Sequence, residues 1–233
     1  MTKFSAASAA QAGAYHLLSR TPCQDSVSVF IYEEGICAVL CDGAGSVSRS
    51  EVISRSVSAH LCRAVSECFG QWYESDDESI RKLIAYVADE AVKEKDPSLR
   101  AECTLILFAA EKDRSMLVHI GDGIAGDAEH VISLPENGAD EWQTFFLSSE
   151  SALQHIRITR DPEWKDLLLL SSDGLSSVLY DKVTGRAAPA VGIMREWLQE
   201  DAAEAEARLR KTMHHTFMDY TGDDMSVILI CRQ

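Results

Sequence analysis

The stretch ICAVLC, residues Ile36–Cys41, is a short apolar run that leads directly into the pair Asp42-Gly43. Two later runs have the same form, because MLVHI at Met116–Ile120 is followed by Gly-Asp-Gly and LLLL at Leu167–Leu170 by Ser-Ser-Asp-Gly. Short runs rich in Val, Ile and Leu and bounded by Gly, Ser and Asp predict buried strands. Further strands are expected at Cys103–Ala110 and Met225–Cys231 and, from weaker patterns, at Val27–Tyr32, Val131–Leu134, Thr144–Leu147 and His155–Thr159.

Three segments show the three- and four-residue spacing of apolar residues that is typical of amphipathic helices. They are Val47–Phe69, Ser79–Glu94 and Pro189–Phe217, the last of which is expected to form two helices separated near Asp201. Because strands and helices do not alternate regularly, their order predicts an α+β fold rather than a doubly wound parallel sheet. No feature of the sequence indicates a second domain, so residues 1–233 are expected to form a single one.

The composition of the chain restricts its partners and its surroundings. The 233 residues include 22 Lys and Arg against 37 Asp and Glu, which gives a formal net charge of −15. This acidity argues against nucleic acid and against a membrane anchor, both of which require clustered basic residues. No apolar run approaches the ~20 residues of a membrane span, and the N-terminus lacks the apolar core of a signal peptide. With seven cysteines and no CxxC pair, a reduced, cytoplasmic protein is expected.

Acidic residues follow the apolar runs at the points where the predicted strands end. They are Asp42, Asp122 and Asp173, and Asp223 precedes the last predicted strand. A single Asp-Gly pair is better interpreted as a turn. Three such pairs favour a joint site, because carboxylates brought together repel one another unless a cation neutralises them. Oxygen ligands suit Mg²⁺ or Mn²⁺, and two such ions can activate a water for attack on a phosphoryl group.

A second group of polar residues lies near the start of the chain, in the segment RTPCQD that runs from Arg20 to Asp25. Arg20 is the nearby cation that could hold a phosphate through two parallel hydrogen bonds. Taken alone, the same residues are equally compatible with a solvated arginine and a turn capped by Asp25.

In this order, the motifs resemble those of the metal-dependent serine/threonine protein phosphatase 2C family, particularly its short bacterial 2C-like branch. Family members carry R-x-x-N-(E/Q)-D, a spacing that Arg20 and Cys23–Asp25 match. The matches extend to Cys231 and cover nearly the whole chain. They comprise D-G-x-G at Asp42–Gly45, a G-(S/C)-T strand at Cys103-Thr104, G-D-(S/G) at Gly121–Gly123, S-D-G at Ser172–Gly174 and D-(N/D)-x-(T/S) at Asp223–Ser226.

The resemblance implies a four-layer α-β-β-α sandwich of two mainly antiparallel sheets flanked by helices, with two Mn²⁺ or Mg²⁺ ions at one end. It implies direct attack by an activated water on phosphoserine or phosphothreonine of a protein substrate, and a cognate serine/threonine kinase. By position, the resemblance implies that Asp42 bridges the two ions and that the Gly43 carbonyl ligates one of them. Asp173 and Asp223 would complete the ligands of the first ion, and Asp122 would bind a third ion. Arg20 would hold the substrate phosphate, and Gln24 and Asp25 would position the water.

The chain departs from the family pattern at several positions. Ser46 replaces a Gly, Gln24 a common Glu, and Asp224, beside the expected ligands, a common Asn. Ala44 stands where some eukaryotic members have a His that is proposed as the general acid, so protonation of the leaving group would fall to water or another residue. The segment Ala125–Thr144 is expected to form a loop or flap beside the site.

Other classes of protein fit the sequence less well. A cysteine-dependent phosphatase needs Cys-x5-Arg, and an aspartyl-nucleophile phosphatase needs Asp-x-Asp after a strand, and neither motif occurs. The serious alternative is a phosphatase-fold module that binds a phosphoprotein, kinase or regulator without turnover. The complete set of acids argues against it, because a pure binding module has no need of mutually repelling carboxylates. The plainest alternative is an α+β domain with Asp-Gly turns.

Overall fold

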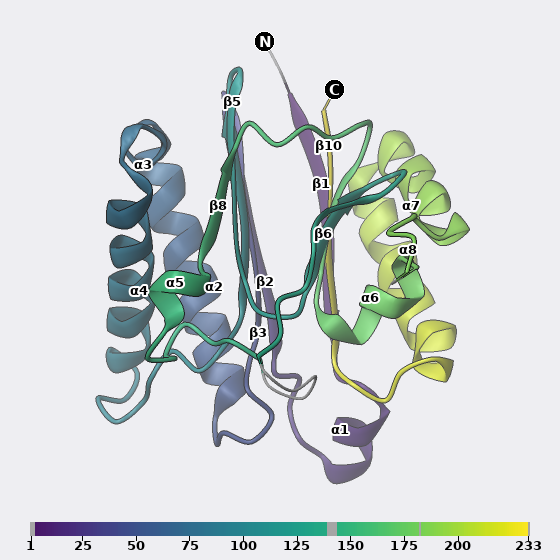
Figure 1. Cartoon of the computed structure of the whole chain (residues 1–233). Helices are drawn as coiled ribbons and strands as arrows, with labels where there is room; N and C mark the ends of the chain where they lie inside the picture. Colours follow the sequence, from purple (N-terminus) through teal and green to yellow (C-terminus); the bar gives the residue numbers. More distant parts are fainter. Residues whose placement is uncertain (1–2, 139–143, 182, 233) are drawn as a thin grey trace.

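In the computed structural model of the chain, which describes residues 3–138, 144–181 and 183–232, two five-stranded sheets stack face to face (Figure 1). Every pair of neighbouring strands is antiparallel. The first sheet has the order β1 (Phe4–Gln11), β10 (Met225–Arg232), β9 (Leu168–Ser171), β6 (Ile124–Asp127), β7 (Val131–Ser133). The second has the order β2 (Asp25–Tyr32), β3 (Gly35–Asp42), β4 (Leu105–Glu111), β5 (Arg114–Ile120), β8 (Arg157–Arg160).

Helices cover the outer faces of both sheets, which confirms the predicted α+β sandwich of four layers (Figure 1). The second sheet is covered by α2 (Ser50–Glu67), α3 (Phe69–Glu74), α4 (Asp77–Lys93) and α5 (Ala152–His155). The first sheet is covered by α6 (Asp173–Leu179), α7 (Pro189–Glu200), α8 (Ala202–His215) and the short 3₁₀ helix η1 (Phe217–Asp219). A further short helix, α1 (Ala14–Ser19), lies at one end of the sandwich, opposite the two chain termini (Figure 1).

The apolar runs are continuous because their strands are buried on both faces. Along β3, Cys37, Val39 and Cys41 pack in the core beneath α2 and α4. The alternate residues Ile36, Ala38 and Leu40 pack between the two sheets. Since successive side chains of a strand point to opposite faces, a strand with a core on each side has no place for solvated polar residues. The same alternation holds for β10.

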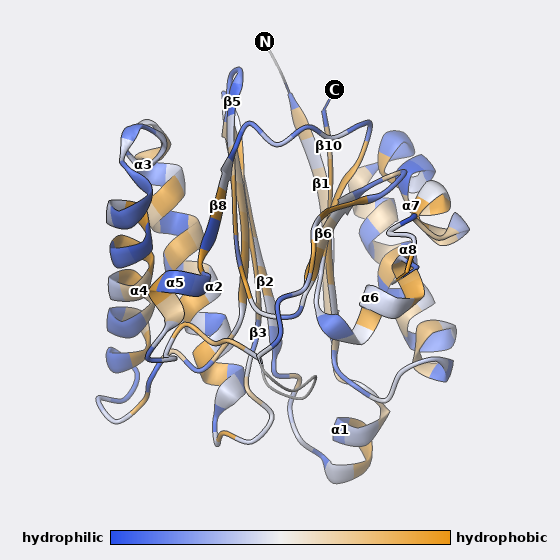
Figure 2. Ribbon diagram, in the orientation of Figure 1, coloured by the Kyte–Doolittle hydropathy of each residue, from blue (hydrophilic) through white to orange (hydrophobic). Residues whose placement is uncertain are grey.

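The helices form where the apolar periodicity predicts them, with their apolar faces turned toward the sheets and their polar faces outward (Figure 2). The separation of α7 from α8 at Asp201 is confirmed, and its physical cause is a helix cap. The Asp201 carboxylate accepts a hydrogen bond from the N–H of Glu204 at 2.8 Å, which satisfies a free donor in the first turn of α8. No helix of the described residues is long and apolar enough to cross a membrane.

Some local predictions were wrong. Thr144–Leu147 is not a strand, because after a single bridge at Thr144 the backbone turns and the Leu147 N–H donates to the Cys103 carbonyl. The expected loop Ala125–Thr144 contains most of β6 and all of β7, and its residues 139–143 lie outside the described residues. The strand predicted at His155–Thr159 begins later, at Arg157. The strands β1 and β6 and the short helices α1, α3, α5, α6 and η1 were not predicted.

Candidate active site

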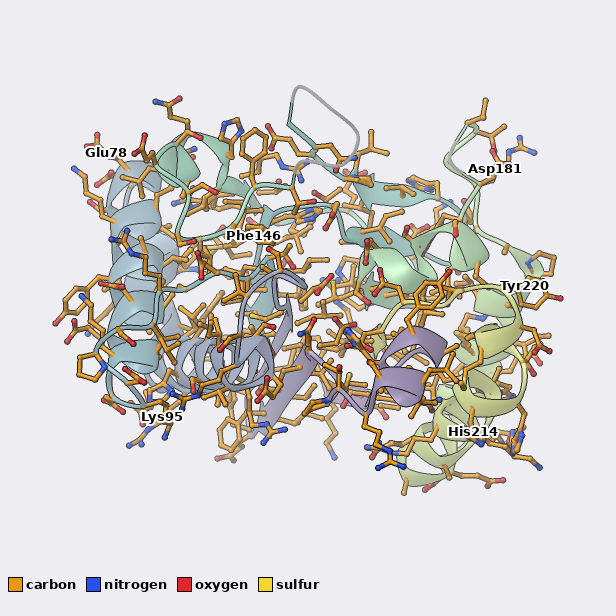
Figure 3. All side chains as sticks on the ribbon, turned by 90° about the horizontal axis from the view of Figure 1, so that it is seen from below. Glu78, Lys95, Phe146, Asp181, His214 and Tyr220 are labelled. Atoms are coloured by element: carbon orange, nitrogen blue, oxygen red, sulfur yellow. The ribbon has the colours of Figure 1, made fainter. Side chains whose placement is uncertain are left out.

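The acidic residues that follow or precede the strands meet at the end of the sandwich where α1 lies. Figure 3 views this end from below, with Phe146 near the centre, between the two helical layers. Phe146 lines a hollow of about 190 Å³ whose walls carry the predicted carboxylates. The acids that line it are Asp42, Asp122, Asp173, Asp223 and Asp224, together with Gln24 and Gly43. The structure therefore brings together seven of the nine residues singled out in the sequence.

Three of these carboxylates are close enough to share an ion. One oxygen each of Asp42, Asp122 and Asp173 lies within 4.8 Å of the others. Burial raises the pKa of Asp42 well above its ordinary value, and the charges of Asp25, Asp173 and Asp122 raise it further. Burial and then the charges of Asp122 and Asp223 raise the pKa of Asp173 to about 7. Such shifts mean that the acids resist ionising together in the absence of a cation.

Asp25 lies directly across from Asp42 in the pairing of β2 with β3. Its side chain is 6% exposed, and neither carboxylate oxygen has a hydrogen-bond partner among the described residues. Burial, with the charge of Asp224 as a further cause, raises the pKa of Asp25 to about 6. Oδ1 of Asp122 is also buried without a partner, whereas its Oδ2 accepts a hydrogen bond from the Thr144 hydroxyl.

These unpartnered oxygens fit a bound cation. A buried carboxylate without a donor is costly, and a cation removes both the missing contact and the mutual repulsion. The donors gathered here are oxygens, which is the ligand type that Mg²⁺ and Mn²⁺ prefer. Asp42, Asp122 and Asp173 are therefore the residues that could hold a metal, and the exposed Asp223 lies on the wall beside them.

Asp224 organises one wall of the hollow and is 4% exposed. Its Oδ1 accepts hydrogen bonds from the Gly13 N–H and from Nδ1 of His16, both at 2.8 Å, and its Oδ2 accepts from the Gln24 N–H at 2.6 Å. Three donors on two oxygens require a carboxylate, because the amide of an Asn would turn an N–H group toward one of them. This accounts for the Asp at a position where the family commonly has Asn.

Two glycines allow the backbone to close around the turn before β10. A Cβ at Gly174, in the first turn of α6, would lie 2.0 Å from the Asp224 carbonyl oxygen, and one at Gly13 would lie 2.0 Å from that of Asp223. Both glycines are thus required by close approach of two backbones. On the second sheet, the Thr104 hydroxyl accepts a hydrogen bond from the Asp42 N–H at 3.2 Å and fixes the end of β3.

Three further residues complete the comparison with the predictions from the sequence. Arg20 is exposed at the C-terminal end of α1, with a φ of 59°, and is not among the residues that line the hollow. His16, which no sequence motif singled out, does line it. Ser46 is exposed and is not among the residues that line the hollow.

Comparisons with known proteins agree with this architecture. Three solved structures share the fold across almost the whole of both chains. The catalytic domain of the phosphatase PstP in complex with two manganese ions has 20% identity and a TM-score of 0.64, with 100% of this chain and 99% of that chain covered. Stp1 from Staphylococcus aureus has 15% identity and a TM-score of 0.61, with 97% and 94% covered. RsbX in complex with magnesium has 15% identity and a TM-score of 0.57, with 99% and 96% covered.

No curated protein matches the chain in sequence. A sequence model described as protein phosphatase 2C matches residues 12–214, a range that includes α1 and three of the five acids on the wall of the hollow. Asp42, Asp122 and Asp173 lie within that range, whereas Asp223 and Asp224 follow it, immediately before β10. The chain belongs to the protein phosphatase 2C family.

Proposed function

We propose that the chain, as one domain over residues 1–233, is a metal-dependent phosphatase that hydrolyses phosphoserine or phosphothreonine in proteins phosphorylated by a serine/threonine kinase. The observation that carries the proposal is the convergence of the partly buried carboxylates of Asp42, Asp122 and Asp173, beside the buried Asp25, whose oxygens have no hydrogen-bond partner among the described residues. The manganese in the PstP structure and the magnesium in the RsbX structure support Mn²⁺ or Mg²⁺ as the cofactor.

The residues around the hollow would have different roles in such a reaction. In this proposal Asp42 and the Gly43 carbonyl would hold two ions, Asp173 and Asp223 would complete the protein ligands of the first, and Asp122 would hold a third. When bound, the ions would neutralise the developing phosphoryl charge and make a water nucleophilic at neutral pH. Gln24 and Asp25 would orient that water, because Gln24 lines the hollow and Asp25 lies beside Asp42.

A larger cavity beside the carboxylates supports the proposal that the substrate is a protein. It has a volume of about 690 Å³ and shares Asp122 and Asp173 with the smaller hollow. Its other walls include the apolar side chains of Val131, Leu134 and Tyr180. A phosphorylated side chain over the carboxylates would thus have room beside it for neighbouring residues of its own chain.

The decisive experiment measures hydrolysis of a phosphoserine peptide and of p-nitrophenyl phosphate with Mn²⁺, with Mg²⁺ and with a chelator. Wild type should turn over both substrates only with metal, and Asp42→Asn should not. His214→Gln, on the exposed face of α8, is the matched control and should behave as wild type. No turnover by pure, folded protein with either ion would overturn the enzyme and favour a phosphatase-fold module that binds a phosphoprotein without hydrolysis.

A further inference from the structure

The short helix α1 is held against the site by polar contacts and not by apolar burial. None of its residues is buried, and Leu17 and Leu18 are 50% and 85% exposed. Its N-terminal end is instead joined to the turn before β10, because the Tyr15 N–H donates to the Gly222 carbonyl at 3.0 Å and the Gly13 N–H to Asp224. These contacts place the next residue, His16, on the wall of the hollow.

The imidazole of His16 is oriented by Asp224. The distance from Nδ1 to Oδ1 of Asp224 is 2.8 Å, and the His16 side chain is 22% exposed. An ionised carboxylate only accepts hydrogen bonds, so Nδ1 carries the hydrogen and the ring is fixed in one orientation. Within the described ranges of the chain, Nε2 of His16 has no hydrogen-bond partner. The ring is therefore anchored through one nitrogen while the other remains available to a bound molecule.

The reaction requires a proton donor, and few of the described side chains on the wall of the hollow could serve as one. Hydrolysis of a serine or threonine phosphate releases an alkoxide, which is a poor leaving group unless it is protonated as the P–O bond breaks. Ala44 lines the hollow without any group that could donate. The other protonatable side chains on the wall are the carboxylates of Asp42, Asp122, Asp173, Asp223 and Asp224, four of which the proposed function assigns to metal ions and one of which holds His16.

We infer that His16 is a catalytic residue that protonates the leaving oxygen of the substrate, an inference that rests on the proposed function. As the water oxygen bonds to phosphorus, the P–O bond to the seryl oxygen breaks and its electron pair takes the proton from Nε2 of His16. The proton lost by the attacking water passes to solvent, and His16 is reprotonated from solvent. The net reaction is phosphate ester plus water to alcohol plus phosphate, with Asp224 holding Nδ1 throughout as a positioning residue.

The test compares leaving groups in His16→Gln and wild type. With a phosphoserine peptide kcat should fall about 100-fold, the usual scale for loss of a general acid, whereas with p-nitrophenyl phosphate it should fall less than about tenfold, because nitrophenolate leaves without a proton. His16→Ala should show the same pattern, with part of the peptide activity restored by added imidazole. His214→Gln is the control. Calorimetry should find the same Mn²⁺ affinity in His16→Gln and wild type, which separates loss of a proton donor from damage to the metal site.

A second readout needs no turnover. Nitrogen-15 spectra of the metal-free protein should show His16 with its hydrogen on Nδ1 in the neutral form. Equal losses on both substrates, unchanged kcat, or a hydrogen on Nε2 would each overturn the role of His16 while leaving the phosphatase intact. A wild type that hydrolyses neither substrate with metal would overturn the proposed function, and the role of His16 with it.

Discussion

Both ends of the sandwich contain buried aspartates, but the hydrogen bonding of these aspartates differs between the two ends. At the end near the chain termini, Asp127 closes β6 and is 1% exposed. Its Oδ1 accepts hydrogen bonds from the N–H groups of Glu129 and His130, at 2.8 and 2.9 Å, and its Oδ2 from that of Lys165 at 3.2 Å. At the end near α1, Asp25 is buried to a similar degree, and neither of its oxygens has a donor among the described residues.

The difference teaches that burial alone does not mark an aspartate as functional. Backbone N–H groups compensate the charge of Asp127, so its burial is explained by the fold. The exposed Asp161 is likewise compensated, since hydrogen bonds from the Tyr73 hydroxyl and the Ser115 N–H lower its pKa. At the end near α1, the pKa values of Asp25, Asp42, Asp122 and Asp173 are raised instead, and so this is the cluster that a cation would complete.

The largest effect is expected from neutralising the acid at the centre of the cluster. Asp42→Asn should lower kcat about a thousandfold, which corresponds to about 4 kcal/mol, because it removes the proposed bridging ligand. The same change should raise the free energy of unfolding of the metal-free protein, since it relieves repulsion with Asp25, Asp173 and Asp122. Steady-state kinetics and urea unfolding in chelator measure the two effects. An Asp42→Asn protein that is less stable than wild type in chelator would contradict the idea of a self-repelling cluster.

The opposite result is expected at the other end of the molecule. Asp127→Ala should lower the free energy of unfolding by about 2–3 kcal/mol, because three backbone N–H groups lose their acceptor. Activity per folded molecule should stay at the wild-type level, since Asp127 lies at the far end of the sandwich from the hollow. Urea unfolding and kinetics at low temperature measure both. A change in kcat as large as that of Asp42→Asn would erase the distinction between the two ends.

The two ends should also respond differently to pH. With native pKa values of about 6 for Asp25 and about 7 for Asp173, against an ordinary value near 4 in the unfolded chain, the native protein binds more protons between about pH 4 and 7. The stability that these groups contribute is therefore complete below about pH 4 and is lost as the pH rises toward 7. The lowered pKa of Asp161 has the opposite sign, and its contribution is lost as the pH falls below about 4.

Urea unfolding at pH 5 and pH 7.5, in chelator and in Mn²⁺, measures this difference. In chelator the wild type should lose stability toward pH 7.5 more steeply than Asp173→Asn does, and Mn²⁺ should remove most of the loss. Parallel pH profiles for the two proteins in chelator would mean that Asp173 ionises normally in the native state.

The parts of this molecule that could be predicted from sequence are those with a local physical cause. The run in β3 is apolar because both of its faces are buried, and Asp42 follows it because the strand ends at the site. The strand β1, by contrast, is composed largely of Ala and Ser and has no local signal, since its pairing with β10 determines it. His16 was missed because its significance depends on Asp224, 208 residues away; the one signal was the unusual acid at position 224.

The smallest effect is expected from substituting Arg20, which tests whether the substrate-binding site extends beyond the hollow. Arg20 and Arg49 are both exposed, both have left-handed backbone, with φ of 59° and 66°, and both flank a helix. Arg49 is paired with Asp96 at 2.8 Å, whereas no ion pair of Arg20 is found in the described part of the chain. If Arg20 holds the substrate phosphate, Arg20→Ala should raise KM roughly tenfold, as expected for one charge-assisted hydrogen bond, with little change in kcat. Arg49→Ala carries the same backbone change and should leave KM unaltered. Equal KM values for the two variants would remove Arg20 from substrate binding and leave His16 as the residue of α1 that reaches the substrate.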